Sequence, residues 1–400
     1  MSVVIFEDDR WSDFYPLSSV RHLGQQILGT ESIIDQVAGR VDDEVSLSGR
    51  TYLEETVKEE TNLSYNEKVD GTVLVINARM NPLLDFETMA AGRSDFALLT
   101  RGEVAMALLT KRKFESAISA DGTLHQKKLV SLSKGLEVVE TQEPLLFSYP
   151  WEMLAANGGA IEAKGGKRRG AGGLSISPEA DVEEFVSFDP SKGPIIIGKK
   201  ARVESFSRIA GPCYIGPKTV VHSALVRGGT TIGEDCRIGG EVENSIVYSH
   251  TNKAHLGYLG HSVVGEWVNL GAGSVTSDLK STYGTVRVAR GSGRIDSGLQ
   301  KLGPMIGDMA KVAIGALIYG GKGIGVSSHC AGRVDRDVSD FTSYDGHRDE
   351  SFELNLDSVL RTQSRMMERR ELALGGPQRT LIEVLYSRTR AEGADTGERR

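Results

Sequence analysis

The sequence predicts an α/β domain, then a parallel β-helix built from hexapeptide repeats, then helices at the carboxy-terminal end. Two observations predict the β-helix. Aliphatic residues recur every six positions from residue 195 onward, and 26 of the 47 glycines in this 400-residue chain lie within residues 193–342. A period of six fits neither a helix nor an ordinary strand. It is typical of a solenoid whose short strands each bury one aliphatic side chain.

The hexad period identifies the expected core positions of the solenoid. Glycine follows many of these positions, and we expect it to supply positive φ where the chain turns at corners. The period breaks at residues 244–258 and 277–305, where we expect functional loops to leave the stack. The aliphatic residues in phase are Ile197, Val203, Ile209, Ile215, Val221, Ile232, Ile238, Val264, Leu270, Ile306, Val312, Ile318 and Ile324.

Four parts of the chain differ in pattern. We assign residues 1–148 to the α/β domain, 149–192 to a helix and a glycine-rich linker, 193–342 to the β-helix and 343–400 to a helical extension. The basic, glycine-rich stretch at 165–173 is interpreted as an exposed linker rather than a phosphate-binding loop.

Apolar runs and helical patterns define the expected elements outside the solenoid. Strands are predicted at 3–6, 72–77 and 95–100. Helices are predicted at 33–41, 86–93, 150–163, 358–372 and 379–390.

The composition excludes several classes of protein. A net charge of −7 gives no general attraction for nucleic acid or an anionic membrane. No run of 18 apolar residues occurs, and the start of the chain lacks the basic flank of a signal peptide. Cys213, Cys236 and Cys330 form no CxxC pair. We therefore expect a cytoplasmic protein without structural zinc.

Two runs within residues 241–278 have a specific pattern. Lys253–Gly260 reads KAHLGYLG, and Val268–Gly273 reads VNLGAG. They resemble the acetyltransferase half of the bifunctional N-acetylglucosamine-1-phosphate uridyltransferase/glucosamine-1-phosphate N-acetyltransferase family. The resemblance implies a left-handed β-helix, acetyl-CoA as co-substrate and a sugar 1-phosphate as acceptor. It also implies a homotrimer with active sites between neighbouring subunits.

The resemblance implies a catalytic role for His255. The acceptor's amine must lose its proton as it attacks the thioester, and an imidazole accepts protons at neutral pH. His255 would be that base. Five further positions align with binding positions of the family: Arg227, Tyr258 and Asn269 for the acceptor, with Arg227 on the phosphate, and Ala272 and Asp278 for acetyl-CoA.

The same segment departs from the family at two positions. Glu243 stands where the family has a second phosphate-binding lysine, and Asp278 stands where it has an asparagine. A cation of the long stretch 280–305 would replace the lysine, and the candidates are Lys280, Arg287, Arg290, Arg294 and Lys301.

An alternative reading of this segment is a metal site. His250, His255 and His261 lie close together in sequence, and hexapeptide carbonic anhydrases bind zinc through histidines at a subunit interface. The surrounding pattern favours the acyltransferase, so no metal ligand is assigned.

Residues 1–22 resemble the opening of sugar nucleotidyltransferases. The glycine loop expected there is replaced by Glu7–Arg10, and the residue expected to bind Mg²⁺ is replaced near Asn77 and Arg79. These departures predict lost or altered nucleotidyl transfer. Arg10 and Arg21 remain as candidate nucleotide-binding residues, and Mg²⁺ is expected only if this domain is active.

Three hypotheses of function follow. The first is an acetyl-CoA-dependent N-acetyltransferase acting on an amino-sugar 1-phosphate, with glucosamine 1-phosphate favoured. The second is a sugar-1-phosphate nucleotidyltransferase that uses UTP or dTTP, alone or as half of a bifunctional enzyme. The third is a non-catalytic trimeric scaffold that binds a nucleotide sugar.

Overall fold

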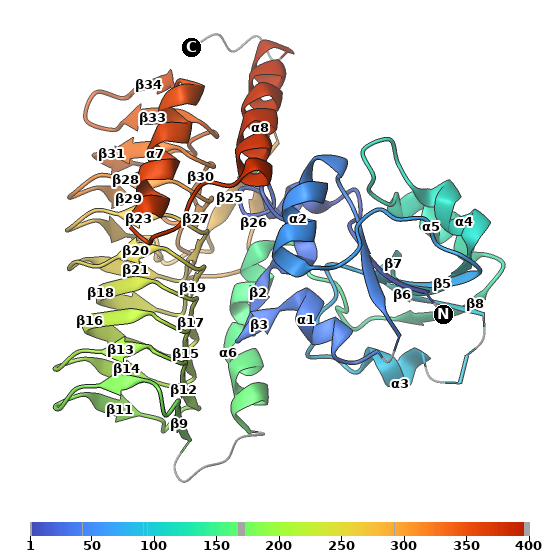
Figure 1. The fold of residues 1–400 in the computed structure, drawn as a ribbon, viewed down its shortest axis with the longest axis horizontal. Helices are drawn as coiled ribbons and strands as arrows, with labels where there is room; N and C mark the ends of the chain where they lie inside the picture. The colour runs from blue at the N-terminus through green and yellow to red at the C-terminus, as the bar shows by residue number, and fades with distance from the viewer. Residues whose placement is uncertain are drawn as a thin grey trace. The chain divides into compact units, whose positions relative to one another are not determined.

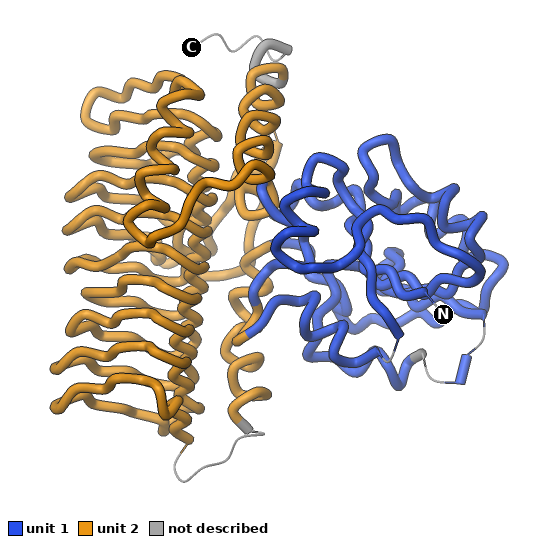
Figure 2. Tube along the Cα trace, viewed as in Figure 1, with its two compact units in different colours: residues 1–14, 20–27, 31–149 blue, residues 15–19, 28–30, 150–400 orange. Residues whose placement is uncertain are grey.

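The computed structural model describes all residues except 1, 42, 91, 94, 167–172, 292 and 396–400. The chain forms two compact units (Figure 2). Unit 1 comprises residues 1–14, 20–27 and 31–149, and unit 2 comprises residues 15–19, 28–30 and 150–400. Most of the glycine-rich stretch predicted as a linker, residues 167–172, lies outside the described residues.

Unit 1 is built on a six-stranded mixed sheet with the strand order β4-β1-β5-β7-β6-β8. β1 is parallel to β4 and β5, whereas β7 runs antiparallel to β5 and β6. The three predicted strands are confirmed as β1, β5 and β6. The strands are β1 (Ser2–Phe6), β4 (Val45–Ser48), β5 (Thr72–Asn77), β6 (Phe96–Thr100), β7 (Glu103–Thr110) and β8 (Glu137–Thr141), with two short strands, β2 (Ile27–Leu28) and β3 (Glu31–Ser32), outside the sheet.

Short helices surround this sheet, and the two helices predicted from the sequence are confirmed as α1 and α3. The Ser32 hydroxyl caps α1 by accepting a hydrogen bond from the backbone N–H of Asp35. The helices are α1 (Ile33–Ala38), α2 (Glu54–Thr61), α3 (Phe86–Ala90), α4 (Lys111–Ala117) and α5 (Gln126–Ser133), with 3-10 turns η1 (Trp11–Phe14), η2 (Leu23–Gln25) and η3 (Thr51–Leu53).

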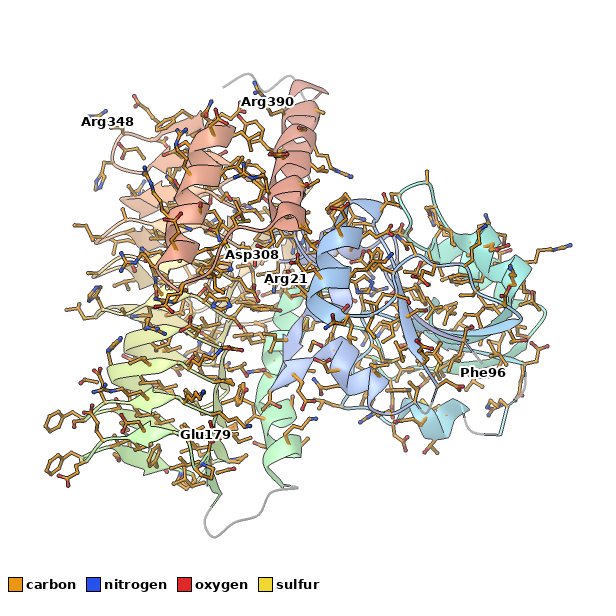
Figure 3. All side chains as sticks on the ribbon, viewed as in Figure 1. Arg21, Phe96, Glu179, Asp308, Arg348 and Arg390 are labelled. Carbon is orange, nitrogen blue, oxygen red and sulfur yellow. The ribbon has the colours of Figure 1, made fainter. Side chains whose placement is uncertain are left out.

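Unit 2 is the left-handed parallel β-helix that the hexad period predicts (Figure 1). Each coil contributes one short strand to each of three faces. Glu179 in the first coil and Arg348 near the last mark the two ends of the stack (Figure 3). The solenoid begins at Leu174, one coil before the range in which the period was read from the sequence.

The first face is an eight-stranded parallel sheet. It contains β9 (Leu174–Ile176), β12 (Ile195–Ile197), β15 (Cys213–Ile215), β17 (Thr230–Ile232), β19 (Ile246–Val247), β22 (Val263–Val264), β27 (Met305–Ile306) and β30 (Gly323–Ile324).

The second and third faces share one sheet, because β16 and β18 continue around the corner between them. The second face contains β10 (Asp181–Val182), β13 (Arg202–Val203), the first parts of β16 (Val220–Val226) and β18 (Arg237–Glu243), β20 (Asn252–Lys253), β23 (Asn269–Leu270), β28 (Lys311–Val312), β31 (His329–Ala331), β33 (Thr342–Asp345) and β34 (Glu350–Glu353). The third face contains β11 (Ser187–Asp189), β14 (Arg208–Ala210), the ends of β16 and β18, β21 (Tyr258–Gly260), β24 (Val275–Thr276), β29 (Leu317–Ile318) and β32 (Arg333–Val334).

The predicted role of the glycines that follow the core residues is wrong. None of Gly198, Gly216, Gly233, Gly265, Gly271, Gly307 and Gly325 has positive φ. A Cβ on Gly233 would instead lie 2.7 Å from the backbone nitrogen of Ser249, and one on Gly271 would lie 2.6 Å from that of Ile314. These glycines are therefore needed because the adjacent coil passes too close for a side chain. Many of the left-handed positions are taken by larger residues such as His250 and Trp267.

The predicted break at 244–258 is also wrong, because an ordinary coil runs through it as β19, β20 and β21. Lys253 occupies the core position of this coil, in register with Ile238. A lysine at an aliphatic position hid the period from the sequence. The second break is confirmed: residues 277–304 leave the stack and include an antiparallel hairpin of β25 (Arg287–Arg290) and β26 (Gly293–Asp296).

Three helices accompany the solenoid. α6 (Pro150–Gly166) lies along the first face, beside β15 and β17. α7 (Leu356–Glu368) and α8 (Gly376–Asp395) confirm the two helices predicted near the carboxy-terminal end. Arg370, just after α7, pairs with Asp235 at 3.2 Å and donates to Asn252 Oδ1 at 2.6 Å, so this segment is tied to the second face.

Candidate active site

His255 lies at an exposed corner between the second and third faces. β20 ends at Lys253, so the chain turns immediately after it and directs His255 away from the core. The next coil turns at the same corner through Ala272, and the backbone N–H of Gly273 donates to the carbonyl of Leu256 at 2.9 Å. The predicted base and the predicted acetyl-CoA residue are therefore on stacked corners of adjacent coils.

Arg227 lies on the third face, directly after the end of β16 at Val226. Its Nε donates to Glu241 Oε1 at 2.7 Å and lies 3.9 Å from Glu243 Oε2. The hydrogen bond to Glu241 raises the pKa of Arg227. The side chain is 49% exposed, so this ion pair is solvated and costs little to exchange for another anion.

Tyr258 lies between the carboxylates of Glu243 and Asp278, and so links the surroundings of Arg227 to the pair of His261 and Asp278. Its hydroxyl lies 3.2 Å from Glu243 Oε2 and 2.8 Å from Asp278 Oδ2, and the same carboxylate oxygen lies 2.6 Å from His261 Nδ1. Burial raises the pKa of Asp278, but the hydrogen bonds from His261 and Tyr258 outweigh it and hold that pKa below its ordinary value. Burial and the neighbouring carboxylates raise the pKa of Tyr258, which therefore stays protonated.

The loop of residues 277–304 places a lysine, Lys301, beside Glu243. Leu302 donates its N–H to the carbonyl of Asp278 at 2.8 Å, which brings Lys301 Nζ to 4.0 Å from Glu243 Oε1. Other cations of the loop have different neighbours: Lys280 donates to the carbonyl of Thr285, and Arg290 lies over the ring of Trp151.

The structure thus brings Arg227, Tyr258 and Asp278 together and places His255 with Ala272. Asn269 lies on the second face, in register with Asn252, and β23 ends two residues before Ala272. Sequence reasoning missed Glu241 and His261 as members of this group. These two residues could have been found from the register of the stacked strands. That register aligns Glu241 with Tyr258, and Glu243 with Gly260, next to His261.

The zinc alternative finds no support here. The ring of His250 stacks on Trp267 with centroids 4.3 Å apart, and His261 is bonded to Asp278. Among the described residues, no group of three histidine, cysteine, aspartate or glutamate side chains is arranged to bind a metal ion.

In unit 1, the carboxylates that replace the glycine loop are buried and paired. Arg50 Nη2 lies 2.6 Å from Glu7 Oε1, and Arg79 Nη2 lies 2.5 Å from Asp8 Oδ2. Burial raises the pKa values of Glu7 and Asp8, but the two guanidinium groups outweigh it and lower both below their ordinary range. These carboxylates are therefore ionised and held within the domain.

The candidate nucleotide-binding residues, and the residues that replace the expected Mg²⁺ ligand, take part in ion pairs and hydrogen bonds within unit 1. Arg10 Nε donates to Asp13 at 2.8 Å, and its Nη1 lies 3.2 Å from Glu103 Oε1. Arg21 is buried, and its carbonyl accepts a hydrogen bond from Arg50. The Asn77 amide donates to Asp8 Oδ2 at 2.8 Å, so a guanidinium and an amide lie against the carboxylate that a metal would need. These residues do not fit a Mg²⁺ ion.

The helices of the described residues include none that is long and apolar enough to span a membrane. Cys213, Cys236 and Cys330 are free and buried.

Comparisons with known proteins find similarity to sugar nucleotidyl transferases and to bifunctional sugar-1-phosphate transferases. Residues 3–165 match the family described as sugar nucleotidyl transferase. A bifunctional sugar-1-phosphate nucleotidylyltransferase/acetyltransferase of Sulfurisphaera tokodaii is 35% identical over 200 residues, which cover 47% of this chain and 45% of that protein. The bifunctional protein GlmU of Synechococcus elongatus is 34% identical over 142 residues, covering 34% of this chain and 26% of that protein.

The match spans less than half the length of these relatives. Among solved structures, the UDP-N-acetylglucosamine acyltransferase of Francisella novicida covers 50% of this chain and 73% of its own at 12% identity and a TM-score of 0.28. The fold assignment therefore rests on the topology of unit 2 itself.

The resemblance found in the sequence is confirmed over these segments, in which the chain is similar to bifunctional sugar-1-phosphate nucleotidylyltransferase/acetyltransferases.

Proposed function

We propose that unit 2 is an acetyl-CoA-dependent N-acetyltransferase whose acceptor is an amino-sugar 1-phosphate, with glucosamine 1-phosphate favoured. The stacking of the His255 and Ala272 corners supports this function most directly. It puts an exposed imidazole next to a small residue that allows close approach of a thioester. The third face, with Arg227 and Tyr258, begins directly after this corner.

The proposed reaction follows from these positions. The acceptor's amine attacks the carbonyl carbon of the thioester, so that a C–N bond forms and the C–S bond breaks. His255 takes the proton that the amine loses and returns it to the departing thiolate, which gives the amide and free CoA. Tyr258 and Asn269 would hold the acceptor, and Asp278 would orient Tyr258 through its hydrogen bond.

Arg227 and Lys301 are the proposed phosphate ligands. Arg227 would exchange its solvated contact with Glu241 for the phosphate, and a guanidinium matches phosphate oxygens in geometry as well as charge. Lys301, 4.0 Å from Glu243, would supply the second positive charge that the family resemblance places at residue 243.

A cytoplasmic homotrimer is part of the proposal. Large apolar side chains stay exposed around the same corner and on the third face of the single chain: Leu256, Val275, Ile314, Leu317 and Tyr319. Such a patch is typical of a surface that another subunit covers. Light scattering should give three times the chain mass of 43.2 kDa, and a monomeric mass would contradict the trimer.

The acetyltransferase is tested by release of free CoA from acetyl-CoA with glucosamine 1-phosphate as acceptor. We expect turnover in the wild type and a loss in kcat of about 10²-fold or more in His255→Ala, because the proton acceptor is removed. Exchange of His222, which lies on the second face, for alanine is the matched control and should leave kcat unchanged. Wild-type activity in His255→Ala would contradict the assigned base.

Nucleotidyl transfer by unit 1 is the second candidate, supported by the family match over residues 3–165. The buried Asp8–Arg79 and Glu7–Arg50 pairs weigh against it, because they fill the position where a nucleotide would need small residues and a free carboxylate. Pyrophosphate release with UTP or dTTP, Mg²⁺ and a sugar 1-phosphate should stay at background. Binding of CoA without acetyl transfer to any amino sugar would instead favour the scaffold hypothesis.

A further inference from the structure

Lys253 is a charged residue in a column of apolar core positions. It is 2% exposed and pairs in register with Ile238. An aliphatic side chain would fill the position as in other coils, and burying an ammonium group there costs free energy. The other inward residues along the second face are Val203, Val221, Ile238, Leu270, Val312 and Cys330.

The ammonium group of Lys253 reaches the corner that carries His255. Nζ donates to the carbonyl of Gly239 at 2.7 Å and to the carbonyl of His255 at 3.0 Å. Gly239 belongs to the corner of the preceding coil, so one ammonium group joins two stacked corners. Burial lowers the pKa of Lys253 to about 8, which leaves the group mostly protonated at neutral pH.

The neighbouring corners are shaped around this contact. A Cβ on Gly239 would collide with the carbonyl oxygen of Ala254, and one on Gly240 would lie 2.9 Å from Lys253 Nζ. On the other side, Gly273 donates its N–H to the carbonyl of Leu256. The backbone around His255 is therefore held from both adjacent coils, and Lys253 supplies the contact on one side.

We propose that Lys253 is a positioning residue, which fixes the direction in which the His255 imidazole leaves the corner. The inference rests on the proposed acetyltransferase, in which His255 takes the amine proton. Lys253 itself lies inside the coil and does not reach the acceptor. Burial of the Lys253 ammonium group destabilises the core. The direction that this group fixes for His255 explains why a lysine stands at this position.

A second lysine, half-buried and next to the core residue Val312, provides a control. Lys311 Nζ donates to the carbonyls of Trp267 at 3.0 Å and Met309 at 2.6 Å, and burial lowers its pKa to about 7. It joins two stacked corners in the same manner as Lys253. Its two carbonyl partners belong to the opposite edge of the second face, away from the corner of His255.

The kinetic test compares Lys253→Met with Lys311→Met. We expect Lys253→Met to lower kcat about tenfold or more while KM for acetyl-CoA and for the acceptor stays within about twofold, since displacement of a catalytic group by about 1 Å is enough for such a loss. Its melting temperature should equal or exceed that of the wild type. Lys311→Met should keep kcat within about twofold. An unchanged kcat in folded Lys253→Met would overturn the inference.

The second test reads the position of His255 without substrate. The ¹H–¹³C signal of the His255 Cε1–H group, assigned with His255→Ala, should shift or broaden in Lys253→Met and stay in place in Lys311→Met. An unmoved signal overturns the inference. If the wild type releases no CoA while the signal moves, the proposed function fails and the positioning contact stands. Lys253→Leu, which copies Leu270 of the next coil, carries the same test if Lys253→Met does not fold.

Discussion

Both units gather charged residues at the positions that the sequence predicts to bind phosphate, but they hold these charges in opposite ways. In unit 1, the side chains of the Glu7–Arg50 and Asp8–Arg79 pairs are at most 1% exposed. On the third face of unit 2, Arg227 is 49% exposed and Glu243 is 28% exposed. Buried pairs are expensive to separate, whereas solvated pairs can exchange partners at little cost. The first arrangement is part of a core, and the second is the proposed binding site for the phosphate.

The largest expected effect comes from breaking a buried pair in unit 1. Arg79→Met leaves Asp8 buried without its partner, which should lower the free energy of unfolding by about 3–5 kcal/mol. Urea denaturation followed by Trp11 fluorescence, with Trp151 and Trp267 replaced by phenylalanine, measures this loss in unit 1. A loss below about 1 kcal/mol would contradict the view of these charges as core.

Two variants control this measurement. Lys111→Met removes an exposed ion pair with Asp70 in unit 1 and should leave the urea midpoint close to that of the wild type. Combining Asp8→Leu with Arg79→Met removes both charges and should recover most of the lost stability, because no charge is left buried alone. An equal loss in the single and double variants would show that packing, rather than charge, dominates.

The contrast between the units also explains what the sequence could predict. The hexad period gave the solenoid because its inward residues, such as Ile238 and Leu270, repeat at a fixed spacing. Lys253 broke that pattern, since the chemistry of a lysine gives no sign that it occupies a core position. The corner glycines were found, but their purpose depends on how closely the next coil approaches, which a single strand does not reveal.

The sequence alone could not predict contacts between side chains that are far apart in the chain. The Asp8–Arg79 pair joins residues 71 positions apart, and it forms because β1 and β5 are neighbours in the sheet. His261 and Asp278 meet because β21 and β24 are stacked with Tyr258 in register with Val275, three residues before each of them. The motif located His255 and Tyr258, whereas the charges around Tyr258 are set by the register of adjacent coils.

A smaller effect is expected from substitution of Glu243 on the third face of unit 2. Glu243 lies 3.9 Å from Arg227 and 4.0 Å from Lys301, so it competes with phosphate for both proposed ligands. Glu243→Lys should therefore raise kcat/KM for glucosamine 1-phosphate by about tenfold, which corresponds to about 1.4 kcal/mol. The measurement is CoA release over a series of acceptor concentrations.

Glucosamine, the acceptor without a phosphate, shows whether the gain in kcat/KM of Glu243→Lys depends on the phosphate. If Glu243 acts through its charge on the phosphate, glucosamine itself should gain nothing from Glu243→Lys, and Glu243→Gln should give an intermediate gain with the phosphorylated acceptor. The hydrogen bond from Tyr258 to Asp278 does not involve residue 243, so we expect it to preserve the orientation of Tyr258 in each variant. An equal gain for both acceptors would place the phosphate away from Arg227. The solvated charges of the third face would then shape the site without binding the anion, and the difference between the two units would be one of exposure alone.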